Sequence, residues 1–260
     1  MIELRTPAEL EQMRTAGEFV ASVLEATTSA SAVGVNLLEL DALAHDMIRA
    51  RGAESCYIDY HPSFGGSPFG KVICTSVNDA ALHGLPHDYT LKDGDVLSLD
   101  FAASVDGWVS DSAVTVIVGT PRDEDARLID VTKRALDAGI AAAVVGNRMG
   151  DVSAAIGEVA RAARLKVNLD FGGHSVGRVM HGDLHVPNDG RAKRGFPLQP
   201  GLVFAIEPWF MLGTKRIYTD DDGWTLRSDD GSRAAHFEHT IAVTDDGPLV
   251  LSAAKTSAAK

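Results

Sequence analysis

Apolar residues recur at helical spacing in two segments near the start of the chain. The first helix is predicted to begin at residues 6–9 (TPAE), a capping box with proline at the first helical position, and to end at about Thr27. The second is predicted over residues 37–51, where leucine, alanine and methionine share one face and Gly52 is the stop. Two amphipathic helices therefore open the fold.

A hairpin of two apolar strands follows in the middle of the chain. Residues 96–102 (VLSLDFA) predict the first strand, and residues 108–118 predict the strand that returns. Between them, Asp106-Gly107 is typical of a two-residue hairpin turn. This turn fixes the register, because residues whose numbers sum to 213 then face each other.

Two aspartates, Asp100 and Asp111, interrupt these apolar strands. The predicted register places Asp100 opposite Ala113 and Asp111 opposite Ala102, so that all four share one face. The two acids are then diagonal neighbours, roughly 7–8 Å apart at the backbone. Bare carboxylates so close together repel each other and are costly to bury, a cost that a divalent metal would remove.

The second part of the chain repeats this order of elements. A third helix is predicted over residues 121–145, ended by Gly146, and a fourth from its cap Asp151 to about Leu165. Residues 166–250 are predicted to be strand and loop. Helices followed by strands thus occur twice, which predicts two similar α+β halves.

No linker divides the chain into independent units. Residues 53–95 mix short strands with glycine-rich loops, but no stretch is rich enough in proline, glycine or serine to separate domains. We therefore expect a single domain over residues 1–251, followed by a frayed tail over residues 252–260.

Charge and composition narrow the possible partners. The chain has 260 residues, 45% of them hydrophobic, and a formal net charge of −12, which argues against nucleic acid or an anionic membrane as partner. Its two cysteines, Cys56 and Cys74, form no CxxC, so neither a disulfide framework nor a cysteine zinc site is expected. The sequence shows no secretory signal and no apolar stretch long enough to span a bilayer, and a cytoplasmic protein is expected.

Beyond the hairpin, four short pieces carry polar groups in apolar surroundings: LHGLP at residues 82–86, GHSVGR at 173–178, VFAIEP at 203–208 and FEHT at 237–240. Glutamate in an apolar strand is rarely fully buried unless it is paired or bound to metal. With the hairpin, these pieces supply five candidate ligands, which are Asp100, Asp111, His174, Glu207 and Glu238. Oxygen and imidazole donors without thiolate suit Mn²⁺, Fe²⁺, Co²⁺ or Zn²⁺, and four carboxylates balance the charge of two such ions.

Residues 173–177 (GHSVG) also match the G-x-S-x-G elbow of serine hydrolases. That motif requires a long helix directly after the serine, whereas Gly182 and residues 187–190 (PNDG) prevent one here. Ser175 is therefore not expected to be a nucleophile, and its replacement by alanine should leave activity intact.

The other histidines are expected to be structural. Loops are predicted to hold three of them, His61, His87 and His185. His239 should point to the strand face opposite Glu238. His236 shares the face of Glu238, where a packing role is expected.

Six stretches match one known family in order: LHGLP, LKDGDVLSLDF with VDGWVSD, GGHSVGRVMH, LQPGLVFAIEPWF, DGWT and AAHFEHTIAVT. Over nearly its whole length the chain resembles the type I methionine aminopeptidases, which are pita-bread metallopeptidases. The resemblance implies an α+β pita-bread fold, in which two pseudo-symmetric halves form a curved antiparallel sheet flanked by helices. It also implies metal-dependent removal of the N-terminal methionine from peptides and nascent proteins.

The resemblance assigns roles to residues at the matching positions. The five candidate ligands would hold two divalent ions of Co, Mn, Fe or Zn, with Asp111 and Glu238 bridging them. Glu207 would shuttle a proton, His83 would lie near the new amine, and His181 near the scissile peptide. The pocket for the methionine side chain would involve four residues, which are Tyr60, Cys74, Met180 and Trp224.

Three features depart from the family pattern. Ser175 stands where glycine is usual, and Gly182 follows His181 where an acidic or other side chain is common. Residues 61–71 form a longer loop, in which Phe69 is expected to be a second aromatic of the pocket. No ligand is lost, so these departures bear on substrate preference and loop shape.

Peptide or nascent-protein N-termini are the expected partners of this chain. We expect a monomer that contacts the ribosome transiently and binds neither nucleic acid nor membrane. An Xaa-Pro-type aminopeptidase or dipeptidase would share the ligand set, but that branch usually carries an extra N-terminal domain. A non-catalytic pita-bread binding protein is expected to have lost ligands, and this chain keeps all five.

Overall fold

The computed structural model describes residues 2–62 and 67–254 of the chain. The helices are α1 (Pro7–Ala30), α2 (Leu37–Arg51), α3 (Asp123–Ala142) and α4 (Met149–Ala163). The strands of the first half are β1 (Glu54–Ser55), β2 (Cys74–Val77), β3 (Ala80–Leu82), β4 (Asp95–Val105) and β5 (Trp108–Val118). Those of the second half are β6 (Lys166–Val167), β7 (Gly173–His174), β8 (His185–Val186), β9 (Val203–Ile206), β10 (Trp209–Met211), β11 (Ile217–Thr219), β12 (Leu226–Ser228), β13 (Ala234–His236), β14 (Glu238–Thr244) and β15 (Gly247–Val250).

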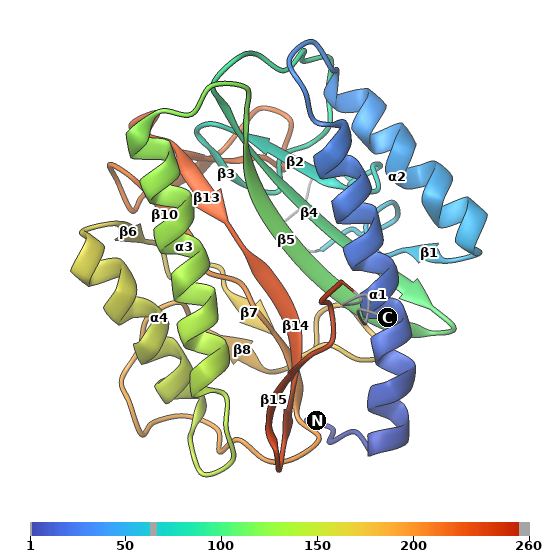
Figure 1. The fold of residues 1–260 in the computed structure, drawn as a ribbon, viewed down its shortest axis with the longest axis vertical. Helices are drawn as coiled ribbons and strands as arrows, with labels where there is room; N and C mark the ends of the chain where they lie inside the picture. The colour runs from blue at the N-terminus through green and yellow to red at the C-terminus, as the bar shows by residue number, and fades with distance from the viewer. Residues whose placement is uncertain (1, 63–66, 255–260) are drawn as a thin grey trace, which may run out of the picture.

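The main sheet joins the two halves of the chain. Its strands are antiparallel in the order β1-β4-β5-β14-β15, with β2 also paired to β4 and β9 to β14. In Figure 1, α1 lies across β4 and β5, while α3 lies beside β13 and β14. The strand β5 of the first half therefore pairs directly with β14 of the second, as the expected two-half α+β fold requires.

The pleat of β4 separates the hydrophobic core from the other face of the sheet. Leu97, Leu99 and Phe101 are fully buried and pack with the apolar faces of α1 and α2. Asp100 and Ala102 alternate with them and therefore point to the opposite face. A second core lies between α3, α4 and the strands of the second half.

The hairpin register predicted from the turn is confirmed. Asp100 pairs with Ala113 and Asp111 with Ala102. The turn residues Asp106 and Gly107 have φ angles of 52° and 75°, because a type I′ turn requires positive φ at both central positions. The two aspartates are therefore held on one face of a continuous, fully paired hairpin.

The first two helices begin and end near the predicted residues. The Thr6 side chain accepts a hydrogen bond from the backbone N–H of Glu9, whose carboxylate accepts one from the Thr6 N–H at 2.8 Å. The helix α1 continues three residues beyond the expected Thr27, to Ala30. The bounds of α2 are as predicted, with Gly52 in the left-handed conformation at its end.

The third and fourth helices differ from the prediction at their ends. The helix α3 begins at Asp123 and ends at Ala142, inside the expected range of 121–145. The helix α4 begins at Met149, so Asp151 is its third residue and not its cap. The Asp151 carboxylate accepts hydrogen bonds from the backbone N–H groups of Arg148 and Lys193, at 2.8 and 2.9 Å. From the first turn of the helix it therefore gives a partner to the backbone N–H of Arg148, the residue that precedes the helix.

The end of the described chain is more ordered than a frayed tail from residue 252 would be. The Leu251 N–H donates to the Thr240 carbonyl at 2.9 Å, and both Leu251 and Ser252 are buried. The predicted tail therefore does not begin at Ser252, and residues 255–260 lie outside the described part of the chain. Among the described helices, none has the length and apolarity needed to cross a membrane.

Candidate metal centre and substrate pocket

One cavity of about 300 Å³ collects the residues on which the sequence prediction rests. All five candidate ligands line it, together with His83 and His181. The four predicted pocket residues, Tyr60, Cys74, Met180 and Trp224, line it too, as does Phe69. Residues spread from Tyr57 to Glu238 thus meet at one place.

Three adjacent strands bring the first acids together. Ala113 of β5 pairs with Asp100 of β4 on one side and with Glu238 of β14 on the other. One face of the sheet therefore carries Asp100, Ala113 and Glu238 in one row across three strands. Asp111 lies on the same face, two residues before Ala113 on β5. Because the side chain of Ala113 is small, it leaves room on this face of the sheet for the carboxylates of Asp100 and Glu238 on either side.

Glu207 and His174 enter from the second half of the chain. Glu207 follows β9 directly, and the next residue, Pro208, ends that strand because proline cannot donate to the ladder. His174 lies on the two-residue strand β7, whose Gly173 passes so close to β9 that a side chain there would collide with the Ala205 carbonyl. His174 Nε2 is 3.5 Å from Glu207 Oε1 as a result.

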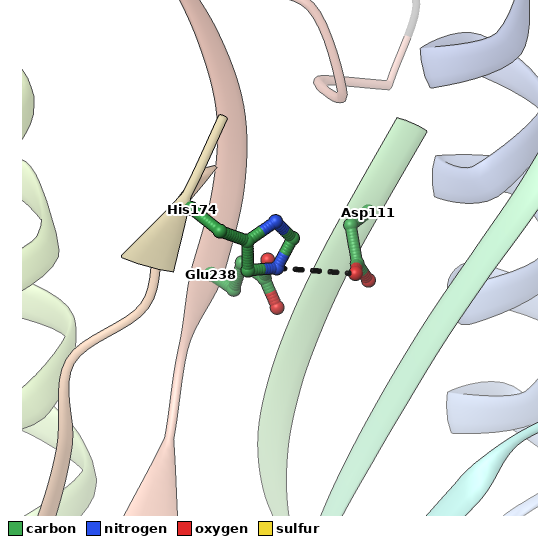
Figure 2. A group of neighbouring side chains, drawn as sticks. All are labelled: Asp111, His174 and Glu238. Carbon is green, nitrogen blue, oxygen red and sulfur yellow. Dashed lines mark ion pairs between the residues drawn. The ribbon is translucent and has the colours of Figure 1, made fainter. Parts of the chain in front are cut away.

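A compact group of possible metal ligands lies at the centre of this arrangement. Asp111, His174 and Glu238 each offer a ligand atom, and these atoms lie within 4.8 Å of one another. Figure 2 shows the three side chains converging from β5, β7 and β14, with His174 Nε2 3.8 Å from Asp111 Oδ2. Ligand atoms within 4.8 Å of one another are close enough to surround one ion.

Asp100 lies beside this group and has a different partner. The Tyr57 hydroxyl donates to Asp100 Oδ1 at 2.6 Å and is 3.2 Å from Asp111 Oδ1. Burial raises the pKa of Tyr57 well above its usual value, and the charges of Asp100 and Asp111 add to this effect. The phenol therefore keeps its proton and acts as a donor.

The four carboxylates are crowded in a setting that lacks positive charge. Burial raises the pKa of Glu207 to about 8, with the charge of Asp100 adding to it, and raises the pKa of Asp100 to about 6. Burial and the neighbouring acids also raise the pKa of Asp111 and Glu238 well above the usual range. Among the described residues, neither lysine nor arginine lines the cavity.

These observations test whether the residues fit divalent cations. Glu238 is 2% exposed, yet its Oε1 has no hydrogen-bond partner among the described residues. An unpaired buried carboxylate oxygen is costly unless a cation or a proton satisfies it. The donor set of oxygens and one imidazole is the one that Mn²⁺, Fe²⁺, Co²⁺ or Zn²⁺ accepts, so the residues fit.

His83 and His181, which also line the cavity, are neutral donors. His83 has a φ of 55° at the end of β3, and its ring meets the ring of Phe171 edge to face at 5.5 Å. Burial lowers the pKa of both His83 and His181 to about 4, and the charge of His181 adds to the effect on His83. Each ring therefore offers one N–H donor at neutral pH.

The predicted pocket is an aromatic box beside the acids. The rings of Tyr60, Phe69 and Trp224 surround it, with centroid distances of 5.2 Å between Phe69 and Trp224 and 6.2 Å between Tyr60 and Trp224. Cys74 and Met180 are buried next to these rings. The cavity thus has an acidic end and an apolar, sulfur-containing end.

Several residues of the cavity were missed by sequence reasoning, namely Tyr57, Asp170, Phe171, Gly172 and His185. His185 was expected in a loop with a structural role, but it lies on β8 opposite His174 and lines the cavity. Its position depends on the pairing of two very short strands, which leave no periodic signal.

The histidines beside Glu238 differ in their surroundings. His236 Nε2 lies 3.8 Å from Glu238 Oε2, and both side chains are buried. His239 is turned away and is hydrogen-bonded to Ser252 Oγ at 2.8 Å. His236 therefore faces the acid cluster and His239 does not, as the strand alternation predicted.

Ser175 has no catalytic surroundings. Its Oγ accepts a hydrogen bond from the Leu184 N–H at 3.2 Å, and it is absent from the described lining of the cavity. Residues 175–184 form no helix. The nucleophile elbow of a serine hydrolase is therefore missing.

Comparison with known proteins supports the same chemistry. A family model described as metallopeptidase family M24 matches residues 11–245. Methionine aminopeptidase 1 of Mycobacterium tuberculosis is 45% identical over 258 residues, covering 96% of this chain and 95% of that relative. The crystal structure of a Thermotoga maritima methionine aminopeptidase superposes with a TM-score of 0.92 at 36% identity, covering 97% of this chain and 99% of the other.

The fold extends to more distant peptidases. A prolidase from Pyrococcus furiosus superposes with a TM-score of 0.76 at 19% identity, covering 97% of this chain and 66% of that one. At this identity the likeness concerns the fold alone. The two helix-flanked halves around the sheet are thus shared with a peptidase of a different name.

Proposed function

We propose, since the chain belongs to metallopeptidase family M24, that it is a methionine aminopeptidase, which removes the N-terminal methionine from peptides and nascent proteins. One observation carries this proposal. Four carboxylates, of which Asp100, Asp111 and Glu238 are buried and Glu207 is largely buried, share a single cavity with an imidazole and an aromatic, sulfur-containing pocket.

The five ligands Asp100, Asp111, His174, Glu207 and Glu238 would hold two divalent ions, of Co, Mn, Fe or Zn. Asp111 and Glu238 belong to the compact group of donors, which supports their role as ligands. The unpartnered Oε1 of Glu238 supports the same assignment. When bound, such ions lower the pKa of water and polarise a carbonyl oxygen.

Glu207 is the residue that moves the proton. Its Oε1 lies 3.5 Å from His174 Nε2, and burial raises the pKa of its carboxyl to about 8. In hydrolysis, Glu207 takes a proton from the attacking water and delivers it to the leaving nitrogen as the C–N bond breaks. The products are free methionine and a peptide with a new amine.

The two neutral histidines orient the substrate. His181 lies next to His174, with ring centroids 4.2 Å apart, and its N–H would donate to the carbonyl oxygen of the scissile peptide as negative charge develops. His83 would donate to the nitrogen that becomes the new N-terminus. Neither role requires a charged imidazole, which agrees with the lowered pKa of both.

The apolar end of the cavity selects the side chain. Methionine is unbranched and makes favourable contacts between its sulfur and aromatic rings. The rings of Tyr60, Phe69 and Trp224, with Cys74 and Met180, would enclose it.

We place this activity in the cytoplasm, on N-termini that leave the ribosome, and expect a monomer with only transient ribosome contact. The test is hydrolysis of Met-Ala-Ser and of Ala-Pro peptides by chelator-treated protein, before and after adding back each metal. We expect cleavage of Met-Ala-Ser only with metal, and little cleavage of Ala-Pro. Metal-independent cleavage, or a preference for Ala-Pro, would contradict the proposal.

A further inference from the structure

We infer that Tyr57 is a positioning residue of the metal centre, whose hydroxyl holds the Asp100 carboxylate toward Asp111 and strengthens binding of the ion that Asp100 coordinates. This inference rests on the proposed ligand set and adds a residue to its support. Tyr57 belongs to none of the motifs on which the family resemblance rests.

The two sides of the ligand cluster are unequal. Asp111, His174 and Glu238 form a compact group of donors, and Asp100 is not part of that group. Its Oδ1 instead accepts the short hydrogen bond from Tyr57, at 2.6 Å. The phenol is also 3.2 Å from Asp111 Oδ1, so it lies between the outlying acid and the compact group.

The two oxygens of Asp111 face in different directions. Oδ1 is the atom near Tyr57, while Oδ2 is the one 3.8 Å from His174 Nε2. Tyr57 therefore contacts the Asp100 side of the centre and leaves the His174 side untouched. An effect of its hydroxyl should fall on one ion more than on the other.

Tyr57 is itself held firmly against the strand that carries Asp100. Its ring is buried and meets the ring of Phe69 edge to face at 5.7 Å. The Tyr57 N–H donates to Ser55 Oγ at 3.1 Å, and the neighbouring Cys56 N–H donates to the Ala102 carbonyl of β4 at 3.4 Å. The hydroxyl thus has a fixed position relative to Asp100.

This hydrogen bond is compatible with metal binding. An ionised carboxylate has about four acceptor positions, so Asp100 can accept from Tyr57 and still bind an ion. Groups that hydrogen-bond to a ligating side chain fix its orientation, and their loss typically lowers metal affinity about 10–100-fold. Without the phenol, Asp100 would lose the 2.6 Å hydrogen bond that orients its carboxylate.

The experiment is calorimetric titration of chelator-stripped full-length protein with Mn²⁺, comparing wild type with Tyr57→Phe. Tyr89→Phe is the matched control, because its hydroxyl donates to Asp95 at 2.9 Å, outside the cavity. We expect Tyr57→Phe to weaken one of two binding steps about 10–100-fold, to leave the other unchanged, and Tyr89→Phe to change neither.

A double-mutant cycle separates positioning from a general loss of structure. If Tyr57 acts through Asp100, Tyr57→Phe should have no effect on Mn²⁺ binding in an Asp100→Asn background. Tyr57→Leu provides a second variant should the phenylalanine protein fold poorly, as judged by its melting temperature. It should weaken the same step.

The outcomes distinguish this inference from the proposed function. Two-step binding that Tyr57→Phe leaves unchanged, tightens, or weakens equally at both steps would overturn the role of Tyr57 alone. A wild-type protein that binds no Mn²⁺ would overturn the proposed ligand set, and the role of Tyr57 with it.

Discussion

The imidazole rings of His174 and His181 lie edge to face, with their centroids 4.2 Å apart and their planes at 68°. His174 approaches the carboxylates of Asp111 and Glu207. The ring centroid of His181 lies 5.2 Å from that of Tyr60 on the pocket side, with the two planes tilted by 47°. Two residues of the same type therefore lie on the two sides of the boundary between the proposed metal ligands and the proposed substrate contacts.

Replacement of His181 by alanine should separate these two roles. Loss of one oxyanion donor lowers turnover about 10²–10³-fold, while the carboxylates and His174 remain in place. We expect kcat on Met-Ala-Ser to fall by this factor with Mn²⁺ affinity nearly unchanged. The matched variant His174→Ala should lose Mn²⁺ affinity. Equal loss of affinity in both variants would contradict the assignment.

Removal of metal should destabilise the protein. Ligands that bind only the folded state add about 2.7 kcal/mol at a concentration 100 times the dissociation constant. We expect the melting temperature to fall in excess chelator and to rise again with added Mn²⁺ or Co²⁺. The reference is the same protein in buffer without chelator. An unchanged melting temperature in chelator would count against metal binding by the acids of the cavity.

The stability of the metal-free protein should fall as the pH rises from 6.5 to 8. The Glu207 carboxyl has a pKa of about 8 in the folded protein and 4.5 when unperturbed, so the folded state binds more protons between these values and stability drops with pH. Histidines with lowered pKa act in the opposite direction, but only up to their ordinary value of 6.5. Above pH 6.5, the carboxyl groups with raised pKa therefore determine that stability falls with rising pH.

This pH effect has a direct check. The melting temperature of chelated protein, measured at pH 6.5 and at pH 8, should be lower at the higher pH. Glu207→Gln cannot ionise and should reduce the difference. Metal should reduce it as well, because bound dications stabilise the charged carboxylates. A rise in melting temperature over this interval in the wild type would contradict the raised pKa of Glu207.

Ser175 and Gly182 should prove interdependent. A side chain at residue 182 would collide with Ser175 Oγ, and the Gly182 N–H donates to the Ser175 carbonyl at 2.8 Å. We expect Gly182→Ala to cost about 1–3 kcal/mol of stability and to lower kcat by displacing the adjacent His181. Ser175→Gly should restore much of both in the double variant.

The same pair provides a test of the rejected nucleophile. Ser175→Ala alone should keep its activity, because Ser175 bonds to the backbone and lies outside the cavity lining described. Peptide hydrolysis by this variant is the measurement. Loss of activity in a normally folded Ser175→Ala protein would revive the serine-hydrolase interpretation.

The register of the hairpin could be predicted to the residue because its turn is local, although the first strand runs over Asp95–Val105 and is longer than the expected 96–102. Asp106-Gly107 allows positive φ at both positions, and this alone sets which residues face each other along both strands. The position of Asp100 and Asp111 then follows from strand alternation. Information contained in a few neighbouring residues was sufficient.

Tyr57 and His185 could not be found in this way. Tyr57 follows a strand of two residues, and His185 begins another, so neither belongs to a periodic segment. Their positions depend on pairing with distant parts of the chain. The place of Asp151 was wrong for a related reason, since an acid in the first turn of a helix and an acid at its cap look alike in the sequence.

The pairing of β5 with β14 has a consequence for how the protein matures. The proposed ligands run from residue 100 to residue 238, and the last of them faces Ala113 only once these two strands have joined. A fragment that ends before residue 238 would carry the hairpin acids with no glutamate beside them. Loading with metal would therefore require that both halves have docked, and an unfinished or clipped chain would lack a complete set of the proposed ligands.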